Sequence, residues 1–185
     1  MTYHLSLQTV GWIVGGLLVV SHLIGFLESN AVRKFLRSFP RSRPAGILLT
    51  VIAAVWAFLL VANIDLGEFT QWRTTILVFI VAAAFLSIRY VDEFLAVRAA
   101  GMIALLAAEP VLEATFLRPE TGRLLLNVLA YAYATAGLFW VGMPYIMRDQ
   151  INWLTSSNGR WRAAALVGIL YGAAILVCAF TQYGR

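Results

Sequence analysis

The chain has 185 residues, of which 61% are hydrophobic and only 12% are charged. A soluble domain is about half apolar and about a quarter charged, so this composition excludes an ordinary soluble protein and favours a helical membrane protein. The net charge of +5 does not indicate nucleic acid, since the chain has no soluble basic module with interleaved aromatic residues. In a membrane protein, such a charge indicates topology and contact with anionic membrane lipids.

Six apolar runs approach the length of about 20 residues that spans a bilayer. We therefore predict an all-α, polytopic integral membrane protein, with residues 1–185 forming a single transmembrane domain of about six helices. Few residues remain for any soluble domain. The predicted spans are Thr9–Leu27, Pro44–Ile64, Thr74–Tyr90, Phe94–Phe116, Leu124–Met147 and Ala163–Tyr183.

The distribution of basic residues predicts the orientation of these spans. No Lys or Arg precedes the first apolar run, which is not typical of a cleavable secretory signal, so we expect this run to remain as a helix. With alternating spans, ten of the 14 basic residues fall on one side, which predicts that this side is cytoplasmic. Both termini would then lie outside the cytoplasm, in a bacterial inner (plasma) membrane. The ten residues are Arg33, Lys34, Arg37, Arg41, Arg43, Arg89, Arg98, Arg148, Arg160 and Arg162.

Two longer connections on the basic side resemble each other. Asn30–Arg43 has the apolar and basic spacing of a short amphipathic helix lying in the interface, and Asp149–Arg162 has a similar apolar part that ends at Ser156–Gly159. Both connections end in Arg-x-Arg and are followed by small residues. This likeness raises the possibility of three helical hairpins, each turning in the cytoplasm.

The fourth run carries charge within an apolar sequence. Arg98 and Glu109 are eleven residues apart, which returns a helix to within roughly 20° of its starting direction, and Glu113 lies one turn further on. An ionisable group in hydrocarbon costs roughly 2.5–3.5 kcal/mol on insertion scales. We therefore expect neighbouring helices or a water-filled cavity to shelter this stripe, and we expect a kink or local opening at Pro110.

The acidic end of this stripe is the principal candidate site. Glu109, Glu113, Asn127 and Tyr131 fall at matching depths on consecutive spans. In one interpretation they form an outward-facing pocket that binds a proton or a cation. In the other, which we favour, they connect helices, because a transport pathway would need polar residues on further spans.

Two further polar sites lie near the cytoplasmic end. Asp92, Glu93 and Arg98 form an inner charge cluster, for which an ion-pair latch at the start of the fourth helix is the favoured interpretation. His22 is a possible axial ligand of haem or of a chlorophyll magnesium. The other histidine, His4, belongs to the opposite side, so a packed or interfacial His22 is the preferred interpretation.

The sequence lacks the residues that several kinds of chemistry require. The chain has one cysteine, no glycine-rich phosphate loop and no hydrolase or metalloprotease motif, and we predict no metal site and no catalytic residue. The first functional hypothesis is a non-catalytic accessory subunit or scaffold that packs against membrane lipids, pigments, other membrane subunits or itself as an oligomer. The alternatives are a small carrier or channel that uses Glu109 and Glu113, and an intramembrane enzyme acting on lipid.

Overall fold

The computed structural model describes residues 3, 5–91 and 93–183, and all regular secondary structure in these residues is helical. Six of the helices are long and apolar enough to cross a membrane, which confirms the predicted all-α polytopic class. They are α1 (Leu7–Leu27), α3 (Arg43–Asn63), α4 (Arg73–Tyr90), α5 (Leu95–Thr115), α6 (Arg123–Gly142) and α8 (Asn158–Thr181). The shorter elements are α2 (Ser29–Ser38), η1 (Phe39–Arg41), η2 (Gly67–Trp72) and α7 (Tyr145–Thr155).

Local chemistry explains where several helices begin and end. Ser6 caps α1 by accepting a hydrogen bond from the Thr9 N–H at 3.0 Å, and Ser42 caps α3 in the same way. The predicted fifth span was wrong at its end, because α6 stops at Gly142. Pro144 follows and cannot donate to the helical ladder, and the chain starts the separate helix α7 there.

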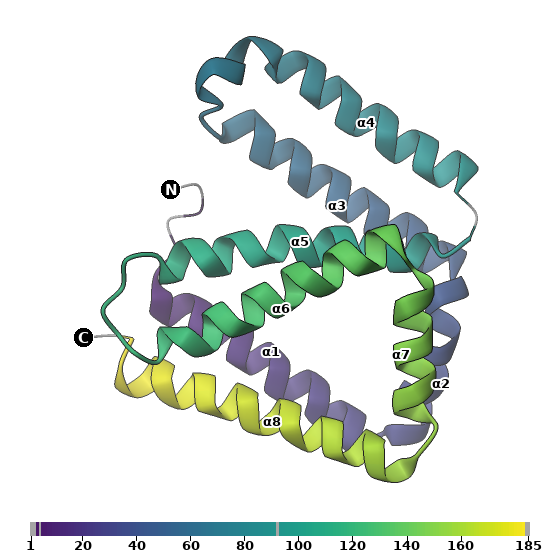
Figure 1. The fold of residues 1–185 in the computed structure, drawn as a ribbon, viewed down its shortest axis with the longest axis vertical. Coiled ribbons are helices and arrows are strands. Elements are labelled where there is room, and N and C mark those ends of the chain that lie inside the picture. The colour runs from purple at the N-terminus through teal and green to yellow at the C-terminus, as the bar shows by residue number, and fades with distance from the viewer. Residues whose placement is uncertain (1–2, 4, 92, 184–185) are drawn as a thin grey trace.

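The long helices pack in pairs rather than as a uniform bundle. Figure 1 shows α1 beside α8 and α5 beside α6, with α3 against α5 and the α3–α4 hairpin extending away from the other helices. The sequential pairs that pack are α3 with α4 and α5 with α6. They are joined by the short connections 64–72 and 116–122. They are therefore a different set from the three hairpins that loop chemistry suggested.

The two pairs α1–α8 and α5–α6 meet at one end and diverge at the other. In Figure 1, α1 begins and α8 ends at the closed end, and α2 and α7 run across the open end. The hydrophobic core lies where the four helices meet and is built from residues such as Leu7, Val111, Leu126 and Ile175. The wide separation at the other end leaves a hollow between the pairs.

Small residues bring the paired helices into close contact. A methyl group added to Gly15 of α1 would lie 3.0 Å from the Gly172 carbonyl of α8, and one added to Gly172 would lie 3.0 Å from the Gly15 carbonyl. Gly101 and Gly137 make the same reciprocal contact between α5 and α6, with 2.9 and 2.8 Å to the opposite carbonyls. Such contacts let backbones approach closely where lipid supplies no hydrophobic driving force.

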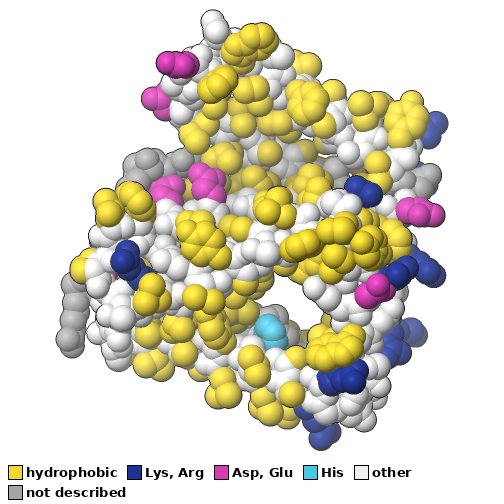
Figure 2. Space-filling view, in the orientation of Figure 1, with side chains coloured by type: hydrophobic (Ala, Val, Ile, Leu, Met, Phe, Trp, Pro, Cys, Tyr) yellow, Lys and Arg dark blue, Asp and Glu magenta, His cyan; other side chains and the backbone are white. Residues whose placement is uncertain are grey.

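Side-chain hydrogen bonds hold the open end together. Arg37 of α2 donates to the Thr155 side chain at 2.8 Å and to its carbonyl at 2.7 Å, and Arg33 donates to Asn158. The Trp161 indole donates to the Gly25 carbonyl at 2.8 Å. The two amphipathic connections predicted from the sequence thus form one corner, where Lys and Arg side chains gather in Figure 2.

Candidate functional site

The acidic residues of α5 lie together in an open groove near the C-terminal end of that helix. Glu109 and Glu113 are one turn apart, and both are partly exposed. In Figure 2, acidic side chains lie over α5, below the α3–α4 hairpin. The groove has a volume of about 670 Å³, and its remaining walls are apolar. They come from Leu105, Ala108, Leu112, Phe116 and Ala134.

The polar neighbours of the two acids come from the N-terminal segment and from α3. The Tyr3 N–H donates to both carboxylate oxygens of Glu113 at 3.2 Å, and the Trp56 indole donates to the Tyr3 hydroxyl at 2.7 Å. Burial raises the pKa of Tyr3, the hydrogen bond from Trp56 offsets part of this rise, and the Glu109 and Glu113 carboxylates add to it. Tyr3 therefore connects α3 to the acidic face of α5.

The structure does not bring all four predicted residues of this site together. Asn127 shares a hydrogen bond with the Thr115 side chain. Thr115 is buried, and it lies about 160° round α5 from Glu113 by helix geometry. Tyr131 is 63% exposed on the surface of α6 and does not line the groove. Matching depth on neighbouring spans therefore did not predict on which side of its helix each residue lies.

The structure describes two of the three residues of the inner cluster, so the ion-pair latch stays a prediction. Arg98 donates to the Val141 carbonyl near the end of α6 at 3.0 Å, and Glu93 is exposed. Asp92 lies outside the described residues. A cation at a helix C-terminus is favourable because the helix dipole leaves partial negative charge there, so the arginine stabilises the α5–α6 pair.

Two other arginines have the same role, which sequence reasoning missed. Arg73, the first residue of α4, donates to the Ala62 and Ile64 carbonyls at the end of α3, both at 2.7 Å. Arg123 begins α6 and donates to the Thr115 carbonyl at 3.1 Å. Each arginine is the first residue of a helix that follows a short connection, and this position is the signal that could have indicated the role.

His22 lies at the wall of the hollow between the two helix pairs (Figure 2). Its Nδ1 lies 2.8 Å from the Leu18 carbonyl oxygen, and its ring packs against Gly168 of α8, where an added methyl group would overlap it. The imidazole is partly exposed to two adjoining cavities.

The described residues contain no cluster of three or more His, Cys, Asp or Glu side chains that could hold a metal ion. The acidic groove offers two partly exposed carboxylates on apolar walls, which suit proton or cation binding better than group transfer. Comparison of the chain with known protein families, with curated proteins and with solved structures found no match.

Proposed function

We propose that the protein is a non-catalytic integral membrane subunit that packs against another membrane-embedded subunit or a second copy of itself. The single observation that carries this proposal is the position of α4. None of its residues is buried, and it packs chiefly on α3, at the edge of the molecule (Figure 1).

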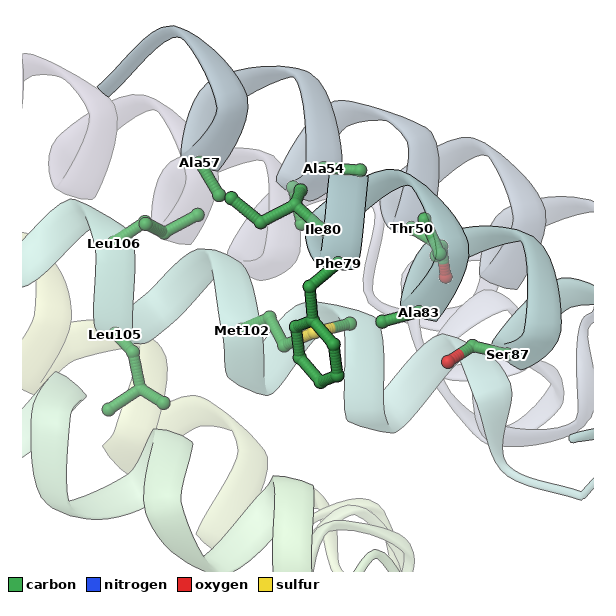
Figure 3. A pocket seen from close by; sticks show the side chains of 12 residues that line it. Thr50, Ala54, Ala57, Phe79, Ile80, Ala83, Ser87, Met102, Leu105 and Leu106 are labelled. Carbon is green, nitrogen blue, oxygen red and sulfur yellow. The ribbon is translucent and has the colours of Figure 1, made fainter. Parts of the chain in front are cut away.

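The inner side of the α3–α4 hairpin supports the same proposal. A groove of about 340 Å³ runs between α3, α4 and α5, and Figure 3 shows Ala54, Ala57, Phe79 and Ala83 among the side chains that line it. Small residues in a transmembrane groove allow a second helix to approach closely, whereas hydrocarbon chains need no such surface. We infer that a helix of a partner subunit covers this groove.

Site-specific photo-crosslinking tests the proposal. A photoreactive residue at Ala83 should give a defined product with a second polypeptide in native membranes. The same residue at Val128, which is 62% exposed on α6, serves as the lipid-facing control. Mass measurement after gentle purification should then show an assembly larger than one chain. A single chain by mass, with no crosslinked product at Ala83, would contradict the proposal.

The acidic groove favours a second candidate, a small carrier or channel for protons or cations. Glu109 and Glu113 face one open groove, and none of the described residues that line it is basic. In proteoliposomes with an internal pH dye and an imposed sodium gradient, Glu109→Gln should abolish any proton movement. Glu93→Gln, an exposed acid outside the groove, is the control. Proton movement that persists in Glu109→Gln would remove this candidate.

The basic corner supports the orientation predicted from the sequence, with α2 and α7 in the cytoplasm of a bacterial cell and both termini outside. The test is labelling of single cysteines in the Cys178→Ser background by a membrane-impermeant maleimide. A cysteine at the exposed Lys34 should react only after the cells are opened. Reaction in intact cells would reverse the orientation.

A further inference from the structure

We propose that the hollow beside His22 binds a neutral, lipid-soluble quinol. One ring hydroxyl of the quinol donates to His22 Nε2, and the second ring oxygen accepts from the Tyr133 hydroxyl. The apolar tail of the quinol lies along the hydrophobic walls. This binding site is independent of whether a partner subunit covers the α3–α4 groove.

Two adjoining cavities provide the space. One of about 510 Å³ lies between α1, α3, α5 and α6, and one of about 330 Å³ lies at the corner of α1, α2, α7 and α8. Both volumes fall in the range of about 300–1,000 Å³ that small-molecule sites occupy. Ser21 and His22 line both cavities, so a ligand that extends from one to the other passes the imidazole.

The hydrogen bonding of His22 determines which ring nitrogen faces a ligand. A carbonyl oxygen only accepts, so Nδ1 carries the hydrogen in its 2.8 Å contact with the Leu18 carbonyl. In the neutral imidazole, Nε2 is left with a lone pair. Nε2 makes no hydrogen bond within the described part of the chain, and Gly168 provides the space for the ring.

Tyr133 supplies a complementary group in the larger cavity. It lies on α6 and lines that cavity with His22, and its hydroxyl has no hydrogen-bond partner among residues 3, 5–91 and 93–183. The other polar groups of the wall already have partners, since the Ser21 hydroxyl donates to the Leu18 carbonyl and the Trp56 indole donates to Tyr3. The cavity thus presents one acceptor and one donor that are left for a ligand. An accessible polar group without a partner in such surroundings loses hydrogen-bonding free energy until a ligand or water satisfies it.

The chemistry of the walls selects among lipid-soluble ligands. No charged side chain lines either cavity in the described structure, so the walls offer no counter-charge to a phosphate headgroup. An acyl chain would satisfy neither polar group, and a metal-bearing tetrapyrrole would use the imidazole but not the phenol. A quinol carries oxygens on opposite sides of one ring and satisfies both groups.

Binding of decylubiquinol to the full chain in nanodiscs tests this proposal. Trp56 and Trp161 border the two cavities, so tryptophan quenching reports occupancy. Wild-type protein should show saturable quenching, and Tyr133→Phe and His22→Leu should each weaken binding roughly fivefold, the effect of one hydrogen bond. Tyr131→Phe, on the exposed surface of the same helix, should bind as wild type does.

Three results would overturn the proposal. One is equal binding of decylbenzene, which has the same tail and no oxygen. Another is wild-type affinity in Tyr133→Phe. This variant keeps the aromatic ring and therefore the packing, so it tests the proposal even if His22→Leu fails to fold. The third is a Soret band on adding haemin that depends on His22 but not on Tyr133, which would assign the cavity to a tetrapyrrole.

Discussion

Adjacent glycines in α1 offer a direct test of the helix pairing. A methyl group added at Gly15 would lie 2.9 Å from the Leu176 side chain and 3.0 Å from the Gly172 carbonyl, whereas one added at Gly16 would have no heavy atom within 4 Å. Gly15→Ala and Gly16→Ala are therefore the same substitution at neighbouring positions of one helix. They differ only in the atoms that the added methyl group contacts across the helix interface.

The expected difference can be worked out from these contacts. Replacing Gly by Ala within a helix stabilises it by about 0.5–1 kcal/mol at either position, so this contribution cancels in the comparison. Overpacking costs typically about 1–3 kcal/mol, and at Gly15 the Gly172 backbone, which cannot change rotamer, must move. Gly15→Ala should thus be about 1–3 kcal/mol less stable than Gly16→Ala.

Thermal unfolding in a mild detergent, followed by circular dichroism, measures this difference. For a chain of this size, 1 kcal/mol shifts the Tm by about 2–4 °C, so the Tm of Gly15→Ala should be roughly 2–12 °C below that of Gly16→Ala. Equal Tm values, or a lower Tm for Gly16→Ala, would refute the close α1–α8 packing from which the prediction follows.

Three other predictions concern the remaining contacts. Gly137→Ala should lower the Tm by several degrees more than Gly142→Ala, because its added methyl group would lie 2.8 Å from the Gly101 carbonyl while Gly142 faces open space; equal effects would contradict the α5–α6 contact. Arg37→Gln should lower the free energy of unfolding by about 1.5–3 kcal/mol, because the hydrogen bonds to Thr155 are lost. Replacement of the exposed Lys34 by Gln, measured in the same unfolding assay, should change this free energy little. Tyr183 donates to the Gly122 carbonyl at 2.7 Å, and burial raises its pKa above the ordinary 10.0. Its contribution to the stability of the folded protein is therefore complete below pH 10 and is lost as the pH rises above 10. A comparison of Tm from pH 8 to 11 should therefore show a steeper fall in wild type than in Tyr183→Phe, and parallel curves would contradict the assignment.

The sequence predicted the positions of most spans well, because an apolar run of bilayer length is a local property. The start of α3 was one residue from its prediction, at Arg43 rather than Pro44. The sixth span was placed to begin at Ala163, yet α8 begins at Asn158. The prediction left Arg160 out of the sixth span because it is charged. In the structure Arg160 is part of α8, and it donates to Ser156 at 3.0 Å.

The candidate site was harder to predict because it depends on contacts between distant segments. The adjacency of Glu109 and Glu113 follows from a spacing of four and was confirmed. The sequence gives no local signal that Tyr3 would contact Glu113, or that Asn127 would turn toward Thr115. Such contacts depend on which helices are neighbours and on their rotation about their axes, and neither is encoded in a single apolar run.

The pairing of α1 with α8 bears on how the protein is made. α1 is synthesised before α8, and the spans α3, α4, α5 and α6 lie between them in the chain. The surface that receives the α1 glycines therefore becomes available only after those four spans have been made. Until then, the polar imidazole on α1 faces lipid or the translocation machinery without its final neighbour. Closure of the four-helix core thus has to wait for the synthesis of α8, and truncation before α8 should leave α1 as the segment most exposed to quality-control proteases.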